Sequence, residues 1–391
     1  MVKNRTEYKP NKSDARLIID APSQNADIYW ATGFWAPDPA VYFQVGGRKY
    51  LVLRDLEVDR AKKCARVSKV FSYSQLEKEI GKQSKRLVGK NGDLGWTHVL
   101  DYLFKKMQIK TILVPKDFGI AYADHLRSLK YKLITKKGPF YEERAIKTAR
   151  EIRQVKMVMK ATEEAMGKAI EQIRKSSVRK GNLYYQGELL TSEKIRELIH
   201  KHLMAKGCVA DLNTIVASGS QGADPHEIGY GPLKAHSSII LDIFPKSLDN
   251  GYYGDITRTV VKGKIPLKLK KMYQAVKNAL DEAASMYRPG VEASDIYSKV
   301  MDIFKDHGFS TGVVKGKRQG FIHGVGHGLG LDIHEEPTIG SASRTLKPGH
   351  LITVEPGLYY YPIGGVRIED LYWITKKGSQ RITQFPYVFE L

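Results

Sequence analysis

The sequence predicts a mixed α/β (α+β) protein with a small N-terminal α/β domain over residues 1–143 and a larger C-terminal domain over residues 144–391. Two observations support this prediction. Up to about residue 129, short apolar runs typical of strands alternate with helical patterns, as in an α/β unit. From Arg144 onward a long amphipathic pattern begins, and later apolar strands each end in an acidic residue.

Composition places the chain among ordinary globular proteins, with 42% hydrophobic and 27% charged residues over 391 positions. No apolar run approaches the roughly 18 residues that span a bilayer, and the polar first residues lack a secretory apolar segment. We therefore expect a cytoplasmic protein without a membrane partner. Cys64 and Cys208 are far apart and show no paired spacing, so neither a disulfide framework nor a cysteine zinc site is expected.

The net charge of +21 raises the question of nucleic-acid binding. The excess of Lys and Arg is spread over both predicted domains, without a basic tail or a basic stripe interleaved with aromatic residues. Such a surface adsorbs polyanions weakly, so specific nucleic-acid binding is not expected.

In the N-terminal domain the patterns predict a sheet with covering helices and no catalytic cluster. The expected elements are a strand over 26–34, hairpin strands over 41–45 and 48–53 around Gly46-Gly47, a Lys-rich helical stretch through residue 90, a helix over 96–107, a strand over 111–115 and a helix over 117–129. We expect this domain to serve packing, oligomerisation or the shaping of a cleft.

The C-terminal domain is predicted to open with the long amphipathic helix and to contain three more helices of structural character. These cover residues 188–204, 267–287 and 295–306, the last capped by Ser294.

The most informative stretch of the C-terminal domain is 323–335, which holds three histidines and four glycines. A zinc-protease helix motif would need a histidine four residues after His334, where the chain has Thr338. A dinucleotide-binding loop would need a glycine at Leu329. The cluster instead indicates metal or acid/base chemistry close to the backbone.

Four acidic residues lie on or next to apolar strands, namely Asp242, Asp255, Glu355 and Glu369. Buried carboxylates are costly unless a cation or a metal compensates them. The first two lie on a predicted hairpin with a turn at 249–251, so both can project into one site. Carboxylates with an imidazole suit Mn²⁺, Fe²⁺, Co²⁺ or Zn²⁺, and five ligands exceed the needs of one catalytic ion, which predicts a two-metal centre.

Together, these signatures resemble those of the M24 metallopeptidases of pita-bread fold, in the branch of aminopeptidase P, prolidase and creatinase. The motifs that carry the resemblance are Asp255-Ile-Thr-Arg-Thr, His323-Gly-x-Gly-His327, His334-Glu335, Val354-Glu355-Pro356-Gly357 and Arg367-Ile-Glu369-Asp370. The resemblance covers nearly the whole chain. It implies a pita-bread catalytic domain over 144–391, preceded by a creatinase-type N-terminal domain that methionine aminopeptidases lack.

The resemblance also implies a role for individual residues. The implied ligands of two divalent ions are Asp242, Asp255, His327, Glu355 and Glu369, with Asp255 and Glu369 bridging the ions. Mn²⁺ is the expected metal, with Co²⁺, Zn²⁺ and Fe²⁺ as alternatives. His226 and His334 are implied to contact the substrate and stabilise the tetrahedral intermediate, Arg367 to support the site, and His323 to line the pocket.

Two features depart from the family pattern. The two aspartates are thirteen residues apart here, since 255 − 242 = 13, where the family has eleven, and Phe244 replaces a usual glycine. An insertion of two residues preserves strand parity, so both aspartates can still face one side. Asp249 is an alternative to Asp242 as ligand, but its Asn and Gly neighbours favour a turn, so Asp242 is preferred.

These inferences predict a dinuclear metallopeptidase that hydrolyses the Xaa-Pro bond at the N-terminus of small proline-containing peptides, as an Xaa-Pro aminopeptidase or dipeptidase. The metal-bridging hydroxide would attack the scissile carbonyl, His334 and one metal would stabilise the oxyanion, and Glu355 would carry a proton to the leaving nitrogen. A homodimer is expected. The alternatives are a creatinase-like amidohydrolase without metal, a methionine aminopeptidase, and a catalytically inactive binding protein of the same fold.

Overall fold

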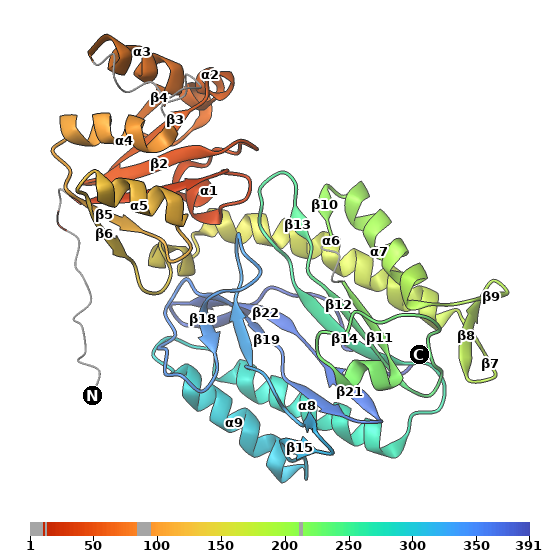
Figure 1. Cartoon of the computed structure of the whole chain (residues 1–391). Helices are drawn as coiled ribbons and strands as arrows, with labels where there is room; N and C mark the ends of the chain where they lie inside the picture. The colour runs from red at the N-terminus through yellow and green to blue at the C-terminus, as the bar shows by residue number, and fades with distance from the viewer. Residues whose placement is uncertain (1–10, 12–13, 84–94, 211–213) are drawn as a thin grey trace. The chain divides into compact units, whose positions relative to one another are not determined.

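A computed structural model describes residues 11, 14–83, 95–210 and 214–391, and the chain divides into two compact units, Met1–Glu142 and Glu143–Leu391 (Figure 1). The division lies one residue before the boundary expected between 143 and 144. Among the described residues, no helix is both long and apolar enough to cross a membrane.

The first unit contains one six-stranded mixed sheet in the order β4-β3-β2-β1-β5-β6. The pairs β1–β2 and β2–β3 are antiparallel and the others are parallel. The strands are β1 Ala15–Asp20, β2 Ala40–Val45, β3 Arg48–Leu53, β4 Lys69–Ser72, β5 Thr111–Val114 and β6 Lys132–Thr135. The helices are α1 Ala26–Thr32, α2 Asp55–Cys64, α3 Tyr73–Gln83, α4 Gly95–Lys106 and α5 Ile120–Ser128.

Helices cover both faces of this sheet because neighbouring strand residues point to opposite sides. Leu17 and Phe43 belong to a core with residues of α3, α4 and α5, whereas Ile18 and Tyr42 belong to a second core with residues of α1 and α2. The predicted α/β character of this region is confirmed, as is the hairpin around Gly46-Gly47. Residues 84–90 of the predicted Lys-rich helical stretch lie outside the described residues.

The prediction of a strand over 26–34 was wrong, because this segment forms helix α1. The Asn25 side chain accepts a hydrogen bond from the Ile28 backbone nitrogen and caps the helix N-terminus. Gly33 ends the helix in a left-handed conformation, and its N–H donates to the Tyr29 carbonyl. The apolar residues of this segment therefore bury one face of a short helix.

The second unit is built from several small antiparallel sheets. They include the five-stranded sheet β18-β17-β19-β22-β23 and the three-stranded sheet β11-β12-β14, and a separate hairpin joins β20 to β21. Their bounds are β11 Ile215–Ser218, β12 Ser238–Ile243, β14 Ile256–Val261, β17 Gly326–Gly328, β18 Glu335–Ile339, β19 Leu351–Val354, β20 Gly357–Tyr360, β21 Gly364–Arg367, β22 Asp370–Thr375 and β23 Gly378–Arg381. The peripheral strands are β7 Ser177–Arg179, β8 Asn182–Tyr185, β9 Glu188–Leu189, β10 Cys208–Val209, β13 Lys246–Ser247, β15 Gly312–Val314 and β16 Lys317–Gln319.

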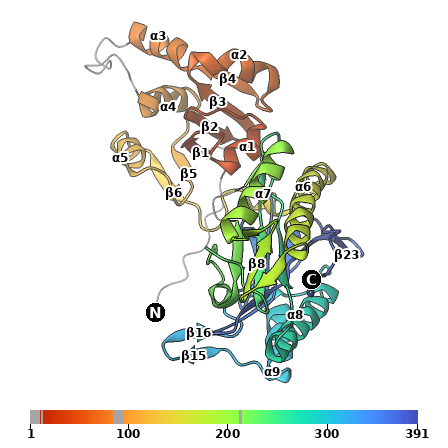
Figure 2. The same cartoon turned by 90° about the vertical axis from the view of Figure 1, so that its right-hand side faces the viewer.

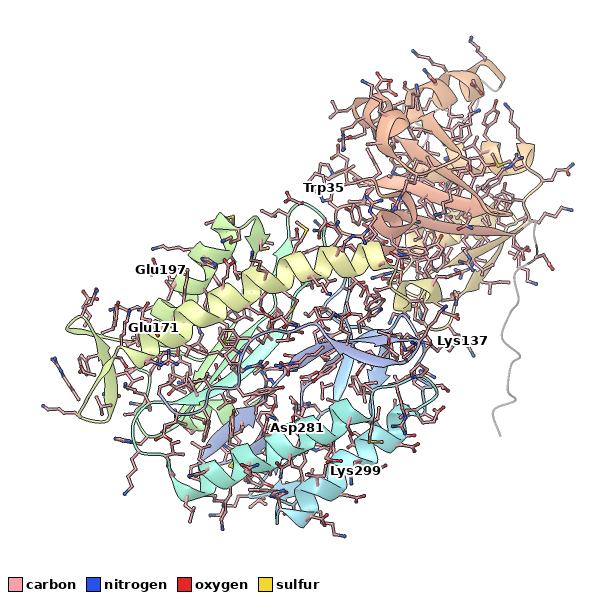
Figure 3. All side chains as sticks on the ribbon, turned by 180° about the vertical axis from the view of Figure 1, so that it is seen from behind. Trp35, Lys137, Glu171, Glu197, Asp281 and Lys299 are labelled. Atoms are coloured by element: carbon pink, nitrogen blue, oxygen red, sulfur yellow. The ribbon has the colours of Figure 1, made fainter. Side chains whose placement is uncertain are left out.

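Four long helices flank these sheets, with α6 and α7 along one side and α8 and α9 along the other (Figure 1). They are α6 Ala149–Arg174, α7 Ser192–Ala205, α8 Leu267–Ser285 and α9 Ala293–Asp306. Figure 2 shows α8 beside α9 and α6 beside α7. Each helix buries its apolar face and exposes charged residues on the other, as the labelled side chains Glu171, Glu197, Asp281 and Lys299 illustrate (Figure 3).

Two helix starts differ from the predictions. Helix α7 begins at Ser192 rather than at residue 188, because Thr191 caps it by accepting from the Lys194 backbone nitrogen. Helix α9 begins at Ala293 with Glu292 at the capping position and no side-chain cap. Ser294 therefore lies inside the first turn and does not cap the helix.

Gly229 provides a test of the backbone around the sheet β11-β12-β14. It has a φ of +81°, and a Cβ atom there would overlap the backbone carbonyl of Val216 on β11, whereas Gly181 has a φ of +76° with open space around it. Gly181→Ala should cost about 1 to 2 kcal/mol from the left-handed conformation alone. Gly229→Ala should cost ~1 to 3 kcal/mol more, because the backbone must also shift. Urea denaturation of both variants measures the difference, and equal free energies of unfolding would contradict the close approach.

Candidate metal centre

Two neighbouring strands place two aspartates on one face of a sheet. Strands β12 and β14 pair antiparallel with Asp242 opposite Thr257. Asp255 lies two residues before Thr257, so strand parity puts its side chain on the same face as that of Asp242. Both aspartates are buried, whereas Asp249 is exposed in the turn beyond β13. The thirteen-residue spacing therefore keeps both aspartates on one face of the sheet, as expected. Asp249, the alternative to Asp242 as ligand, lies away from the acids of that face.

Backbone hydrogen bonds bring the two glutamates to the same place. The Glu369 nitrogen donates to the Thr257 carbonyl, which joins the end of β21 to strand β14. The Glu355 nitrogen donates to the Val325 carbonyl just before β17, the strand that carries the central histidine. Glu355 thus comes from the sheet that contains β17 and β19, and Glu369 is joined by its backbone to the sheet that carries the two aspartates.

The His327 side chain faces three of these carboxylates, those of Asp255, Glu355 and Glu369. Its Nε2 atom lies 3.4 Å from a Glu355 oxygen. The same atom lies 3.6 Å from an Asp255 oxygen and 4.0 Å from a Glu369 oxygen. The Nδ1 atom lies 3.1 Å from the Gly328 carbonyl oxygen, which can only accept, so Nδ1 carries the proton. The Nε2 lone pair therefore faces the carboxylates, as metal ligation requires.

The donor atoms fit a divalent cation. Ligand atoms of Asp255, His327 and Glu369 all lie within 4.8 Å of one another, and all three residues are buried. Among the described residues, Asp242 Oδ1 and Glu369 Oε1 are buried oxygens without a hydrogen-bond partner. Unpaired buried carboxylate oxygens are costly, and a cation with hard oxygen and imidazole ligands would compensate them.

The electrostatics of the protein atoms alone lead to the same requirement. Burial, together with the neighbouring carboxylates, raises the pKa of Asp255 and of Glu369 well above their usual values. Burial likewise raises the pKa of Glu355 to about 8, and Asp242 adds to this rise. Several carboxylates in one buried space cannot all be ionised without added positive charge.

Arg367 supplies part of that charge and begins a chain of buried hydrogen bonds. One Nη atom donates to Asp242 at 2.6 Å, and the other donates to the Tyr359 hydroxyl at 2.9 Å. Because His323 Nδ1 donates to the Gly324 carbonyl at 2.7 Å, its Nε2 accepts from the Tyr359 hydroxyl at 2.9 Å. Burial lowers the pKa of His323 to about 3, so this ring is neutral. Both of its nitrogens are occupied, which suits a pocket wall better than a proton carrier.

The two remaining histidines of the predicted site lie at its accessible edge. The His334 ring packs edge-on against the His327 ring, with 4.4 Å between centroids and an interplanar angle of 82°. His226 is exposed in the loop after η2 (Gly219–Ala223), near enough to contribute to the lowered pKa of His334 after burial, and to that of His323 after burial and Arg367. All nine predicted site residues therefore gather around one region of the second unit.

Three residues that contact this cluster were not singled out from the sequence. Tyr359 joins Arg367 to His323, and the buried Thr257 donates to Glu369 Oε2 at 2.9 Å. The fully buried Arg258 donates to the backbone carbonyl of Glu369 at 2.7 Å. Thr257 and Arg258 follow Asp255 within a recognised motif, so their position next to a predicted ligand was the available signal. Tyr359 has no comparable signal, because aromatic residues are common in buried strands.

Comparison with known proteins identifies the family. The sequence pattern of metallopeptidase family M24 matches residues 153–376, more than half of the chain. The chain belongs to metallopeptidase family M24. A divalent metal site is therefore expected of it, in agreement with the donor atoms around His327. Among its M24 relatives, the Xaa-Pro dipeptidase of Pyrococcus furiosus is 33% identical over 243 residues, which are 62% of this chain and 64% of that protein. The alignment thus spans less than two thirds of this relative.

Solved structures of a prolidase and an Xaa-Pro dipeptidase share the fold over nearly the whole chain. The prolidase from Pyrococcus horikoshii is 26% identical, with a TM-score of 0.75 over 96% of this chain and 95% of that one. The Xaa-Pro dipeptidase from Bacillus anthracis has a TM-score of 0.78 at 24% identity, over 97% of this chain and 95% of that one. These similarities confirm the predicted pita-bread fold with an N-terminal domain.

Proposed function

We propose that this chain is a metal-dependent peptidase that hydrolyses the Xaa-Pro bond at the N-terminus of small peptides, as an aminopeptidase P or a prolidase does. The observation that supports this most strongly is the set of buried carboxylates around the Nε2 atom of His327, in a member of a metallopeptidase family. The relatives named as Xaa-Pro dipeptidases point to the bond that is cleaved.

The donor set is large enough for two ions. The ions would be held by Asp242, Asp255, His327, Glu355 and Glu369, and Asp255 and Glu369 would serve both of them. Mn²⁺ is the proposed metal, and Co²⁺, Zn²⁺ or Fe²⁺ suit the same oxygen and nitrogen ligands. Bound divalent ions of this kind supply an activated water and polarise the scissile carbonyl.

The protein residues then bind the peptide and move its protons. Glu355, whose carboxylate lies beside His327, takes a proton from the attacking water and passes it to the leaving imino nitrogen. His334 and His226, at the accessible edge, donate hydrogen bonds to the substrate and to the developing oxyanion. Arg367 holds Asp242 in place, and His323 lines the pocket through its bond to Tyr359.

The direct test is release of the N-terminal residue from Xaa-Pro dipeptides and Xaa-Pro-Xaa tripeptides by metal-free protein reloaded with Mn²⁺, Co²⁺ or Zn²⁺. We expect release from proline peptides and little from matched Xaa-Ala peptides. His334→Ala should lose about 10²- to 10³-fold in turnover, as removal of one oxyanion donor does, while it keeps its metal. His327→Ala should lose a bound metal ion in addition to turnover, because His327 is a proposed ligand.

Two outcomes would contradict this assignment. If His334 is a packing residue, His334→Ala lowers the melting temperature and leaves turnover per folded molecule near normal. If the wild-type protein is inactive with every metal, the chain is a binding protein of the M24 fold.

Metal stoichiometry tests the proposed bridging. Calorimetric titration of metal-free protein should give two divalent ions per chain, and Asp255→Ala or Glu369→Ala should weaken both sites because each side chain serves both ions. Asp249→Asn is the matched control, since this acid is exposed in the turn. Full occupancy of one site after either ligand substitution would rule out the bridge, and loss of metal in the control would reassign Asp249.

We also propose a homodimer, because the first unit is a large α/β unit without a metal-binding cluster among its described residues. Such a unit is available to meet a second subunit. Light scattering at micromolar concentration should give twice the chain mass of 44.1 kDa. A monomeric mass together with full peptidase activity would contradict the dimer.

A further inference from the structure

Glu335 follows His334 and belongs to a buried ionic cluster that the proposed chemistry does not use. Its side chain is only 7% exposed. One carboxylate oxygen lies 2.5 Å from Arg144 Nη2, and the other lies 2.5 Å from Lys147 Nζ. Arg144 and Lys147 precede helix α6 in the same unit, and Lys147 is 2% exposed. The carboxylate is therefore held by two cations that come from a distant part of the sequence.

The same carboxylate also organises the loop that leads to His334. Glu335 Oε1 accepts hydrogen bonds from the backbone nitrogens of Leu331 at 2.9 Å and Asp332 at 3.2 Å. The chain wraps so closely that a Cβ atom at Gly330 would lie 2.6 Å from a Glu335 oxygen. One side chain thus fixes both the course of residues 330–332 and their distance from the start of α6.

His334 lies between this anchored loop and strand β18. The strand begins at Glu335, which pairs with Gly328 next to the proposed ligand His327. The edge-on contact between the His334 and His327 rings therefore depends on the backbone that the Glu335 carboxylate holds. A shift of about 1 Å in a catalytic group can cost on the order of 10²-fold in rate.

We propose that Glu335 is a positioning residue: clamped by Arg144 and Lys147, it fixes the loop 330–334 and thereby sets the place of the His334 imidazole at the edge of the metal centre. This role deepens the proposed function and rests on it, because the position of His334 affects turnover only if the chain is a peptidase. The competing view is that the cluster is a buried ion pair that serves stability alone.

The charge state of Glu335 determines when the clamp acts. Burial alone would raise the pKa of Glu335, but Lys147 and Arg144 outweigh burial and hold the pKa below its usual value. A carboxyl with a lowered folded-state pKa contributes stability above its unfolded-state pKa, and this contribution is lost as pH falls through the folded-state pKa. The stability difference between wild type and Glu335→Gln should therefore be largest near neutral pH and shrink in acid.

Glu335→Gln tests the proposal, because it keeps the size of the side chain and removes its charge. We expect turnover to fall about 10- to 100-fold, since His334 is displaced. The KM should change much less than the turnover, because His226 still binds the substrate, and the affinity for Mn²⁺ should stay within about threefold, because the proposed ligands are unaffected. Asp332→Asn is the matched control: it loses an ion pair with the same arginine from the same loop, but its side chain is 54% exposed. We expect near-normal turnover from this control, as for most exposed ion pairs.

A double-mutant cycle separates positioning from stability. In a His334→Ala background, Glu335→Gln should cost little further turnover, although it should still lower the melting temperature. An equal loss of turnover in both backgrounds would overturn the proposal, as would normal turnover of the single variant. If Glu335→Gln does not fold, Arg144→Lys weakens the clamp without removing its charge and enters the same cycle.

Crystal structures of wild type and the variant separate this inference from the proposed function. If the wild-type protein cleaves no Xaa-Pro peptide, the proposed function fails, but the position of the His334 ring is still measured. A displaced loop 330–334 in Glu335→Gln supports the positioning role. An unmoved loop and ring overturn it, whatever the activity of the protein.

Discussion

The concentration of negative charge inside the second unit is the constraint on which the rest of its structure depends. The buried Asp242, Asp255 and Glu369 lie with the partly buried Glu355 beside the neutral imidazole of His327 and the guanidinium of Arg367. Burial and mutual repulsion raise the pKa of Asp255 and Glu369, so keeping these groups ionised in the folded chain is costly unless a cation compensates them. The metal site is therefore part of the stability of the fold as well as of its chemistry.

The surrounding structure holds this charge in place from several directions. Behind Glu369, the buried Arg258 donates to its carbonyl and pairs with Asp370 at 2.8 Å. The same guanidinium donates to the carbonyls of Phe385 and Pro386, which ties the last residues of the chain to the back of the site. On the accessible side, the clamp on Glu335 shapes the loop before β18. Neither network contributes a ligand, yet both fix the backbone from which reactive side chains project.

The sequence predicts the structure well where the period of a strand or the spacing of two residues determines which way side chains point. Strand parity allows Asp242 and Asp255 to face one side, and the pairing of Asp242 with Thr257, two residues after Asp255, agrees with this prediction. His327 and His334 lie in a strand and a loop, in keeping with the low helix propensity of the two glycines between them. The prediction of a strand over 26–34 was wrong because Asn25 and Gly33, which mark the two ends of a helix, determine the structure of this segment more than its apolar composition does. Contacts such as Tyr359 with Arg367 depend on how separate sheets meet, which no local pattern encodes.

The buried acids of the second unit require a divalent cation, and the melting temperature of one variant without the charge of Glu369 tests this requirement most directly. Glu369→Gln removes one negative charge and can keep the bond from Thr257 through its amide oxygen. With a chelator present, the variant should melt at or above the temperature of wild type, because repulsion is relieved. With saturating Mn²⁺ the order should reverse, because wild type binds the ion more tightly. The requirement for a cation would be contradicted if wild type melted at a higher temperature than the variant in the chelator, and if Mn²⁺ raised the melting temperature of wild type no more than that of the variant.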